Sequence, residues 1–162
     1  MTNEQKKSRK CIITRDIAGK LNLDETYVFM WLLYKSNCNT GESHVLRKTL
    51  CDVTGLKNED TISKYTNKFK ELELLDKYSI KGYNEEAGRI STSMTYTINI
   101  PTMNWVRFDA SLLTEEIPNK LKAFLVLLKC LCLNNTNVTS YSKNKIAQLL
   151  NMDRGTVSKY ME

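Results

Sequence analysis

Two near-identical five-residue stretches carry the side chains best suited to recognition chemistry. They occupy residues 61–65 and 156–160, lie 95 residues apart, and differ only in having Ile62 in the first and Val157 in the second. Each presents hydroxyl groups and a lysine ammonium, which form hydrogen bonds but need a base or a cofactor before they take part in covalent chemistry. The repeat therefore predicts two equivalent binding surfaces rather than a catalytic centre.

No residue pattern typical of an enzyme accompanies these stretches. The sequence has no glycine-rich phosphate loop, no metal-ligand cluster and no pairing of a nucleophile with a base. The only histidine, His44, has no evident partner, and the adjacent Glu115 and Glu116 fall in a predicted loop. The five cysteines form no CxxC pair, so we expect reduced thiols in a cytoplasmic protein. We expect no enzymatic activity, no cofactor and no metal.

The segments before the two stretches predict how they are positioned. Each has a short amphipathic helix, then a residue that tolerates the left-handed conformation (Gly55 or Asn151), then a second helix with a polar N-cap. We predict helices over residues 47–54 and 59–73, and again from a cap at Ser142 to residue 150 and, after a cap at Asp153, over 154–162. Two helices joined by such a turn are typical of a helix-turn-helix.

Two apolar helices and one hairpin complete the predicted elements. The helices cover residues 27–34, with Asp24 as N-cap, and 121–133. Alternation of apolar and polar residues near the end of the 90–100 segment predicts a strand, which pairs with residues 74–81 around a turn at 84–88. We also expect short extended segments at residues 11–17, 43–46, 105–109 and 138–141.

A helix pair followed by a hairpin resembles the winged helix-turn-helix superfamily, and residues 69–75 resemble the exit from its recognition helix into the wing. The start of each half is similar to winged-helix domains of replication initiators and accessory DNA-binding proteins of plasmids, phages and conjugative elements. The resemblance implies a mostly α fold with a small β-hairpin wing, α+β in class. It implies two tandem winged helix-turn-helix units, the second lacking its wing.

These patterns also predict how the chain is divided. We expect a basic flexible tail at residues 1–10, a first winged helix-turn-helix domain at 11–100 and a helix-turn-helix domain at 101–162. Because the sequence ends inside the second recognition helix, we expect it to be a fragment of a longer protein. No apolar run approaches about 18 residues, so we expect no membrane association.

The resemblance and the charge predict sequence-specific binding of double-stranded DNA, in replication initiation, transfer or transcription control of a mobile element. Lysine and arginine number 24 against 18 acidic residues, and the excess is +3 in each of residues 1–100 and 101–162. Amide, hydroxyl and cationic side chains at exposed helix positions reach base edges, and lysines at helix ends reach phosphates. The expected DNA-binding residues are Lys48, Lys57, Asn58, Thr61, Ser63, Lys64, Asn67, Lys68, Lys143, Lys145, Arg154, Thr156, Ser158 and Lys159, with Lys77, Lys81 and Arg89 on the wing.

An alternative is a winged-helix module used for protein–protein assembly, with another protein or a second copy as its partner. The wing turn carries Glu85 and Glu86, which phosphates would repel. The sequence leaves both alternatives open.

Overall fold

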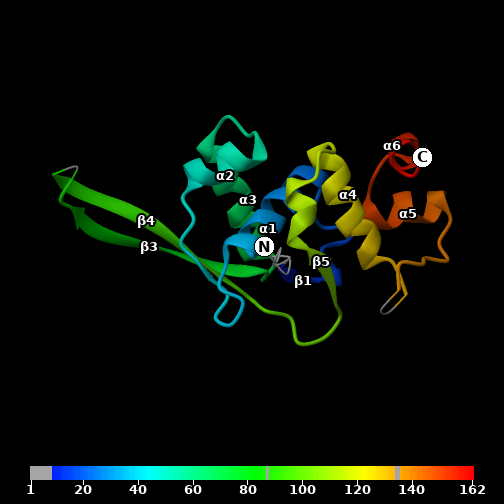
Figure 1. The fold of residues 1–162 in the computed structure, drawn as a ribbon, viewed down its shortest axis with the longest axis horizontal. Coiled ribbons are helices and arrows are strands. Elements are labelled where there is room, and N and C mark those ends of the chain that lie inside the picture. Colours follow the sequence, from blue (N-terminus) through cyan, green and yellow to red (C-terminus); the bar gives the residue numbers. More distant parts are fainter. Residues whose placement is uncertain (1–8, 87, 134–135) are drawn as a thin grey trace, which may run out of the picture. The chain divides into compact units, whose positions relative to one another are not determined.

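The computed structural model describes residues 9–86, 88–133 and 136–162 (Figure 1). Within these residues the chain is α+β, with six α-helices, two 3₁₀ helices and two small antiparallel sheets. In chain order the elements are β1 (Lys10–Thr14), η1 (Arg15–Ile17), α1 (Leu23–Lys35), β2 (Glu42–Ser43), α2 (Arg47–Thr54), α3 (Glu59–Glu71), β3 (Leu75–Asn84), β4 (Arg89–Ile98), β5 (Trp105–Asp109), η2 (Ala110–Thr114), α4 (Asn119–Cys130), α5 (Lys143–Leu150) and α6 (Arg154–Tyr160).

The chain folds into two compact units whose boundaries differ from those expected. One unit is Trp31–Ile100, and the other combines the residues up to Met30 with Pro101–Glu162. The sequence-based division assigned 11–100 to one domain, but β1 pairs with β5 and so joins the start of the chain to its C-terminal part. Most of the expected tail, residues 1–8, lies outside the described residues.

The β1–β5 pair is an antiparallel ribbon with one apolar face. Cys11 and Ile13 of β1 are buried with Val106 and Phe108 of β5. The two strands start at Lys10 and Trp105, which are 95 residues apart, the same spacing as the repeated stretches. The middle pair of the register is Ile12 with Arg107, also 95 residues apart.

One end of the ribbon is held by an ion pair. Lys10 Nζ lies 2.7 Å from Asp109 Oδ2, and the Ser111 amide donates to Asp109 Oδ1 at 3.0 Å. The hydrogen bond from Lys10, followed by the one from the Ser111 amide, lowers the pKa of Asp109 from its ordinary 3.8 to about 2. A carboxyl whose pKa is lower in the folded state stabilises the fold above its unfolded pKa.

We therefore expect Asp109→Asn to lower the free energy of unfolding at pH 7, with the deficit shrinking as pH falls from about 4 to about 2. Over that interval wild-type Asp109 becomes protonated and loses its advantage. Denaturant unfolding at several pH values measures the difference. Lys10→Ala removes the principal partner and should show the same pH dependence; a Lys10→Ala curve parallel to wild type throughout would contradict this account.

In the unit Trp31–Ile100, α2 packs against α3, and α3 packs against the base of a long hairpin. Gly55 ends α2 with φ 76° and ψ 7°, and the Asn58 side chain accepts from the Asp60 amide to begin α3. Leu50, Ile62, Phe69, Leu75 and Tyr96 are among the fully buried side chains. The hairpin β3–β4 extends well beyond α2 and α3, and β2 adds a short third strand to β4 (Figure 1).

In the other unit, α4, α5 and α6 follow the ribbon. Asn151 ends α5 with φ 52° and ψ 46°, and Asp153 accepts from the Thr156 amide to begin α6. On α4, the buried Lys122 is satisfied because its ammonium donates to the Leu113 carbonyl at 2.9 Å. Phe124, on the same helix, packs against the Tyr160 ring of α6 at 5.3 Å between centroids.

The two helix pairs bury equivalent positions. The number of residues that separates equivalent positions changes from 96 to 95 at the turn between the two helices of each pair. Residues 50, 51 and 54 of α2 are buried, as are 146, 147 and 150 of α5, at an offset of 96. Ile62 and Val157 are both fully buried at an offset of 95. The first turn therefore holds one more residue between its left-handed position and its N-cap than the second.

Most predicted helices and the hairpin are confirmed, including α2 with its predicted bounds, while several local predictions are wrong. Of the expected extended segments, residues 15–17 form η1 instead, and residues 44–46 lie outside β2. The N-terminal cap of α1 is Asn22, not Asp24: Asn22 Oδ1 accepts from the Glu25 amide at 2.8 Å, and the Asn22 amide donates to Glu25 Oε1 at 3.1 Å. This reciprocal pair is favoured because the two residues lie three apart. Residues 138–141 form no strand, because the Thr136 hydroxyl bonds to the Val138 amide at 3.2 Å and closes a turn.

Candidate nucleic-acid interface

Three cations gather beside α3 in the unit Trp31–Ile100. Arg47, the first residue of α2, donates from Nη1 to Ser63 Oγ on α3 at 2.8 Å. Lys77, near the base of β3, donates from Nζ to Thr66 Oγ1 on the same helix at 3.2 Å. Lys70 is exposed near the end of α3. We call Arg47, Lys70 and Lys77 the α3 basic cluster.

The charges in the α3 basic cluster act on one another. Burial lowers the pKa of Lys77, and the nearby positive charges of Lys70 and Arg47 lower it further. Three cations close enough to disfavour protonation form a surface that gains free energy when an anion binds. A phosphate group would offset this repulsion, because it supplies the negative charge that the cluster lacks.

The α3 basic cluster lies along the same flank of α3 as side chains that can read bases. Ser63, Asn67 and Lys70 follow one another at helical spacings of four and three, so they share one side of the helix. Asn67 is exposed and Ser63 is half-buried. Cations beside amide and hydroxyl groups match a surface that holds phosphates while polar groups contact bases.

Other predicted residues of this unit are placed less uniformly. Lys48, Lys57 and Lys64 are exposed, whereas Thr61 and Lys68 are half-buried. Asn58 is exposed, but its side-chain oxygen accepts from the Asp60 amide at 2.8 Å and caps α3. Its oxygen is therefore already engaged, and of its amide group only the nitrogen remains to donate to a base.

The second helix pair presents a similar surface in the other unit. Lys143 and Lys145 are exposed in the first turn of α5, and Arg154 and Lys159 are exposed on α6. Thr156 and Ser158 are half-buried. Thr156 occupies the third helical position of α6, as Thr61 does in α3, and both are half-buried. The two repeated stretches thus have alike local environments.

The wing residues are spread along the hairpin. Lys77 lies at its base within the α3 basic cluster, whereas Lys81 and Arg89 are exposed further out. Glu85 and Glu86 are exposed at the turn. Tyr83 and Ile90 face each other across the strands and are 68% and 70% exposed. The outer hairpin therefore combines both charge signs with an apolar pair.

Sequence reasoning missed two members of the α3 basic cluster, Arg47 and Lys70. Lys70 lies seven residues after Ser63, so the helical period alone could have placed both on one flank. Arg47 carried no such signal. Its contact with Ser63 spans 16 residues and depends on the packing of α2 against α3.

The cysteines and other potential metal ligands are placed as follows in the described part of the chain. Among these residues no group of His, Cys, Asp or Glu is arranged to hold a metal ion. All five cysteines are free thiols, and only Cys38 is exposed. Burial raises the pKa of Cys130 to about 12, which keeps that thiol protonated and unreactive. No helix in residues 9–86, 88–133 and 136–162 combines the length and apolar character that crossing a membrane requires.

No known protein family, curated protein or solved structure matches this chain.

Proposed function

We propose that this chain binds double-stranded DNA sequence-specifically through two winged helix-turn-helix units, the second without a wing. In this proposal α3 and α6 are the recognition helices, and β3–β4 is the wing of the first unit. The setting implied by the resemblance is replication initiation, transfer or transcription control of a mobile element.

The observation that carries the proposal is the α3 basic cluster beside Ser63 and Asn67. A recognition helix needs hydrogen-bonding side chains for base edges and cations for the flanking phosphates. Arg47 lies on α2, which precedes α3 in the chain, and Lys77 lies on β3, which follows α3. Both supply such cations. The equivalent burial and capping of α5–α6 support a second reader built in the same way.

The test is a fluorescence-anisotropy titration of the full chain against a labelled pool of random 30-base-pair duplexes at moderate salt. We expect binding in the range of about 1–100 μM for non-specific DNA, tightening after selection of preferred duplexes from the pool. The apparent affinity should fall linearly on a log–log plot against salt concentration. Binding that stays undetectable at about 100 μM would overturn the proposal.

The outer hairpin favours one alternative, a winged-helix module for protein assembly. An exposed apolar pair, Tyr83 and Ile90, beside the acidic Glu85 and Glu86 suits a protein surface better than a phosphate backbone. Undetectable DNA binding together with concentration-dependent self-association in sedimentation velocity would favour this alternative.

A further inference from the structure

The outer edge of β5 offers backbone hydrogen-bonding groups to a partner. The Arg15 amide donates to the Asn104 carbonyl at 2.9 Å, and the Ala110 amide donates to the Arg9 carbonyl at 2.8 Å. Because antiparallel hydrogen-bonded pairs alternate along a ribbon, Val106 and Phe108 bond to β1. The amides and carbonyls of Trp105 and Arg107 therefore point away from β1, and among the described residues none hydrogen-bonds to them.

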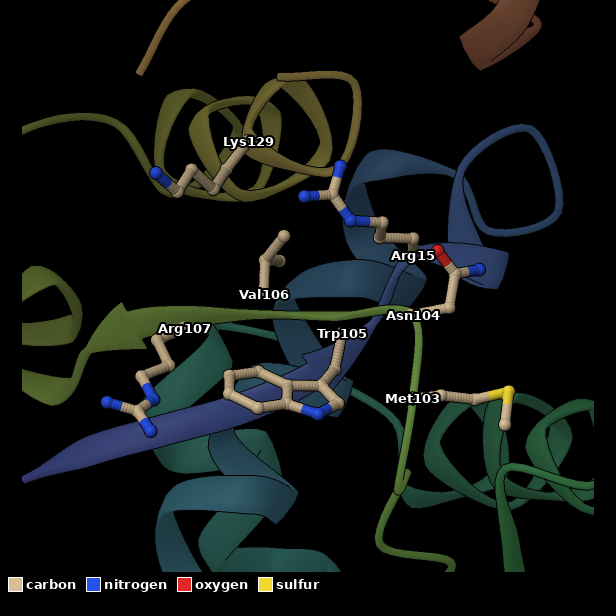
Figure 2. Close-up of a pocket in the computed structure, with 7 residues that line it drawn as sticks. All are labelled: Arg15, Met103, Asn104, Trp105, Val106, Arg107 and Lys129. Atoms are coloured by element: carbon tan, nitrogen blue, oxygen red, sulfur yellow. The ribbon is translucent and has the colours of Figure 1, made fainter. Parts of the chain in front are cut away.

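A cavity of about 700 Å³ opens at this edge, and its lining is cationic. It is formed within one unit by Arg15, Met103, Asn104, Trp105, Val106, Arg107 and Lys129. Figure 2 shows Arg15 and Lys129 on the same side of the strand as Val106, with Trp105 and Arg107 on the opposite side. Among the residues that the structure describes, the lining has three cations and no carboxylate.

Local contacts hold two of these cations in place. Arg15 Nη1 donates to the carbonyls of Cys130 and Cys132 at 2.9 and 2.7 Å, at the end of α4. Lys129 Nζ donates to the Thr136 carbonyl at 2.5 Å and to Asn137 Oδ1 at 2.6 Å. These acceptors are neutral carbonyl and amide oxygens, and they hold the Arg15 and Lys129 side chains at the cavity.

On the other side of the strand, the Arg107 guanidinium lies over the Trp105 ring, 5.0 Å from its centroid. Arg107 is exposed. The stacking fixes the direction of the guanidinium and leaves its positive charge available to an anion.

We propose that the outer edge of β5 binds an extended acidic peptide segment of a partner protein, which adds as a third strand to the β1–β5 ribbon. The partner's backbone pairs with the outward amides and carbonyls of Trp105 and Arg107. Its side chains alternate between the two faces, so carboxylates reach Arg15 and Lys129 on one side and Arg107 on the other. None of the residues assigned to DNA binding belongs to this surface.

A peptide fits this edge better than single-stranded nucleic acid. Stacking of a base requires an open aromatic face, whereas the Arg107 guanidinium already covers one face of Trp105. A nucleic acid would also leave the outward amides and carbonyls without the regular partners that a strand supplies.

The experiment uses the full chain and a fluorescein-labelled, acetylated seven-residue peptide, Val-Glu-Glu-Val-Glu-Glu-Val, which places glutamates on both faces of the added strand. We expect saturable binding, competed by the unlabelled peptide and absent for a matched peptide with Lys in place of Glu. A version N-methylated at every residue keeps the charge but cannot donate backbone hydrogen bonds, so its binding should also be lost. Equal binding of the methylated and unmethylated peptides would overturn the proposal.

Two variants at Arg107 separate the charge from the backbone. Arg107→Ala removes the cation, and we expect about tenfold weaker peptide binding. Arg107→Pro also removes the outward amide without touching the ladder to β1, and we expect a further severalfold loss. If both variants bind as wild type while their circular dichroism is unchanged, the edge is not the site.

A twelve-residue oligothymidine serves as the single-stranded competitor. We expect it to leave the bound peptide in place. Displacement of the peptide by oligothymidine, with the same loss of oligothymidine binding in Arg107→Ala, would overturn the peptide assignment in favour of single-stranded nucleic acid. Because Arg107 is not among the proposed duplex-binding residues, duplex binding should be unchanged in both Arg107 variants.

Discussion

Replacing Arg47, Lys70 and Lys77 together with alanine is expected to weaken binding to duplex DNA by at least about thirtyfold at moderate salt. The three cations lie beside the flank of α3 that carries Ser63 and Asn67. If each contacts one phosphate, the slope of log affinity against log salt should become shallower by about three units. Anisotropy titrations of wild type and variant over a series of salt concentrations measure both quantities.

A matched control removes the same net charge elsewhere. Lys20, Lys35 and Lys120 are exposed and lie outside the predicted DNA-binding set, so their triple alanine variant should change affinity only slightly. An equal loss in both triple variants would show that net charge alone drives binding.

Lys159→Ala tests α6 separately, and unchanged affinity on long duplexes would exclude α6 as a recognition helix.

Gly41→Ala is expected to destabilise the fold by about 3 kcal/mol or more. Gly41 has φ 75°, which an alanine adopts only with strain, and a Cβ there would lie 2.4 Å from the Ile98 carbonyl oxygen. That oxygen belongs to the backbone at the end of β4, and the Gly41 carbonyl accepts from the Ile98 amide at 2.8 Å. Neither the loop at Gly41 nor the end of β4 at Ile98 can move away without breaking the hydrogen bond between them. Denaturant unfolding measures the loss.

Gly55→Ala separates conformational strain from the steric contact. Gly55 has φ 76°, nearly the same as Gly41, but a Cβ there would meet no atom of the described residues within 4 Å. We expect a loss of only about 1 kcal/mol, the cost of the left-handed conformation alone. If Gly41→Ala and Gly55→Ala lose equal stability, the close approach of residue 41 to Ile98 does not contribute to the destabilisation by Gly41→Ala.

The sequence was most informative where a local cap determines the structure. Gly55, Asn151, Ser142 and Asp153 mark four ends of three helices, because each acts on backbone groups only a few residues away. The N-cap of α1 was misassigned because Asn22 and Asp24 are both suitable caps. Only the reciprocal bonds between Asn22 and Glu25 distinguish them.

Long-range features could not be predicted in the same way. The pairing of β1 with β5 joins residues about a hundred positions apart, and neither strand carries a local marker of its partner. The α3 basic cluster likewise combines residues from α2, α3 and β3. The predicted lysines on α3 followed from the helical period, whereas Arg47 required the packed structure.

The β1–β5 ribbon has the register of an isologous dimer contact within a single chain. The two strands of an antiparallel ribbon are related by a local twofold axis, which here passes through the central pair, Ile12 and Arg107. The pair Cys11–Phe108 is then the counterpart of Ile13–Val106. Fusion of two copies of a self-pairing strand would produce this arrangement. Because both strands belong to one chain, their pairing is independent of protein concentration, whereas two separate copies would dissociate on dilution.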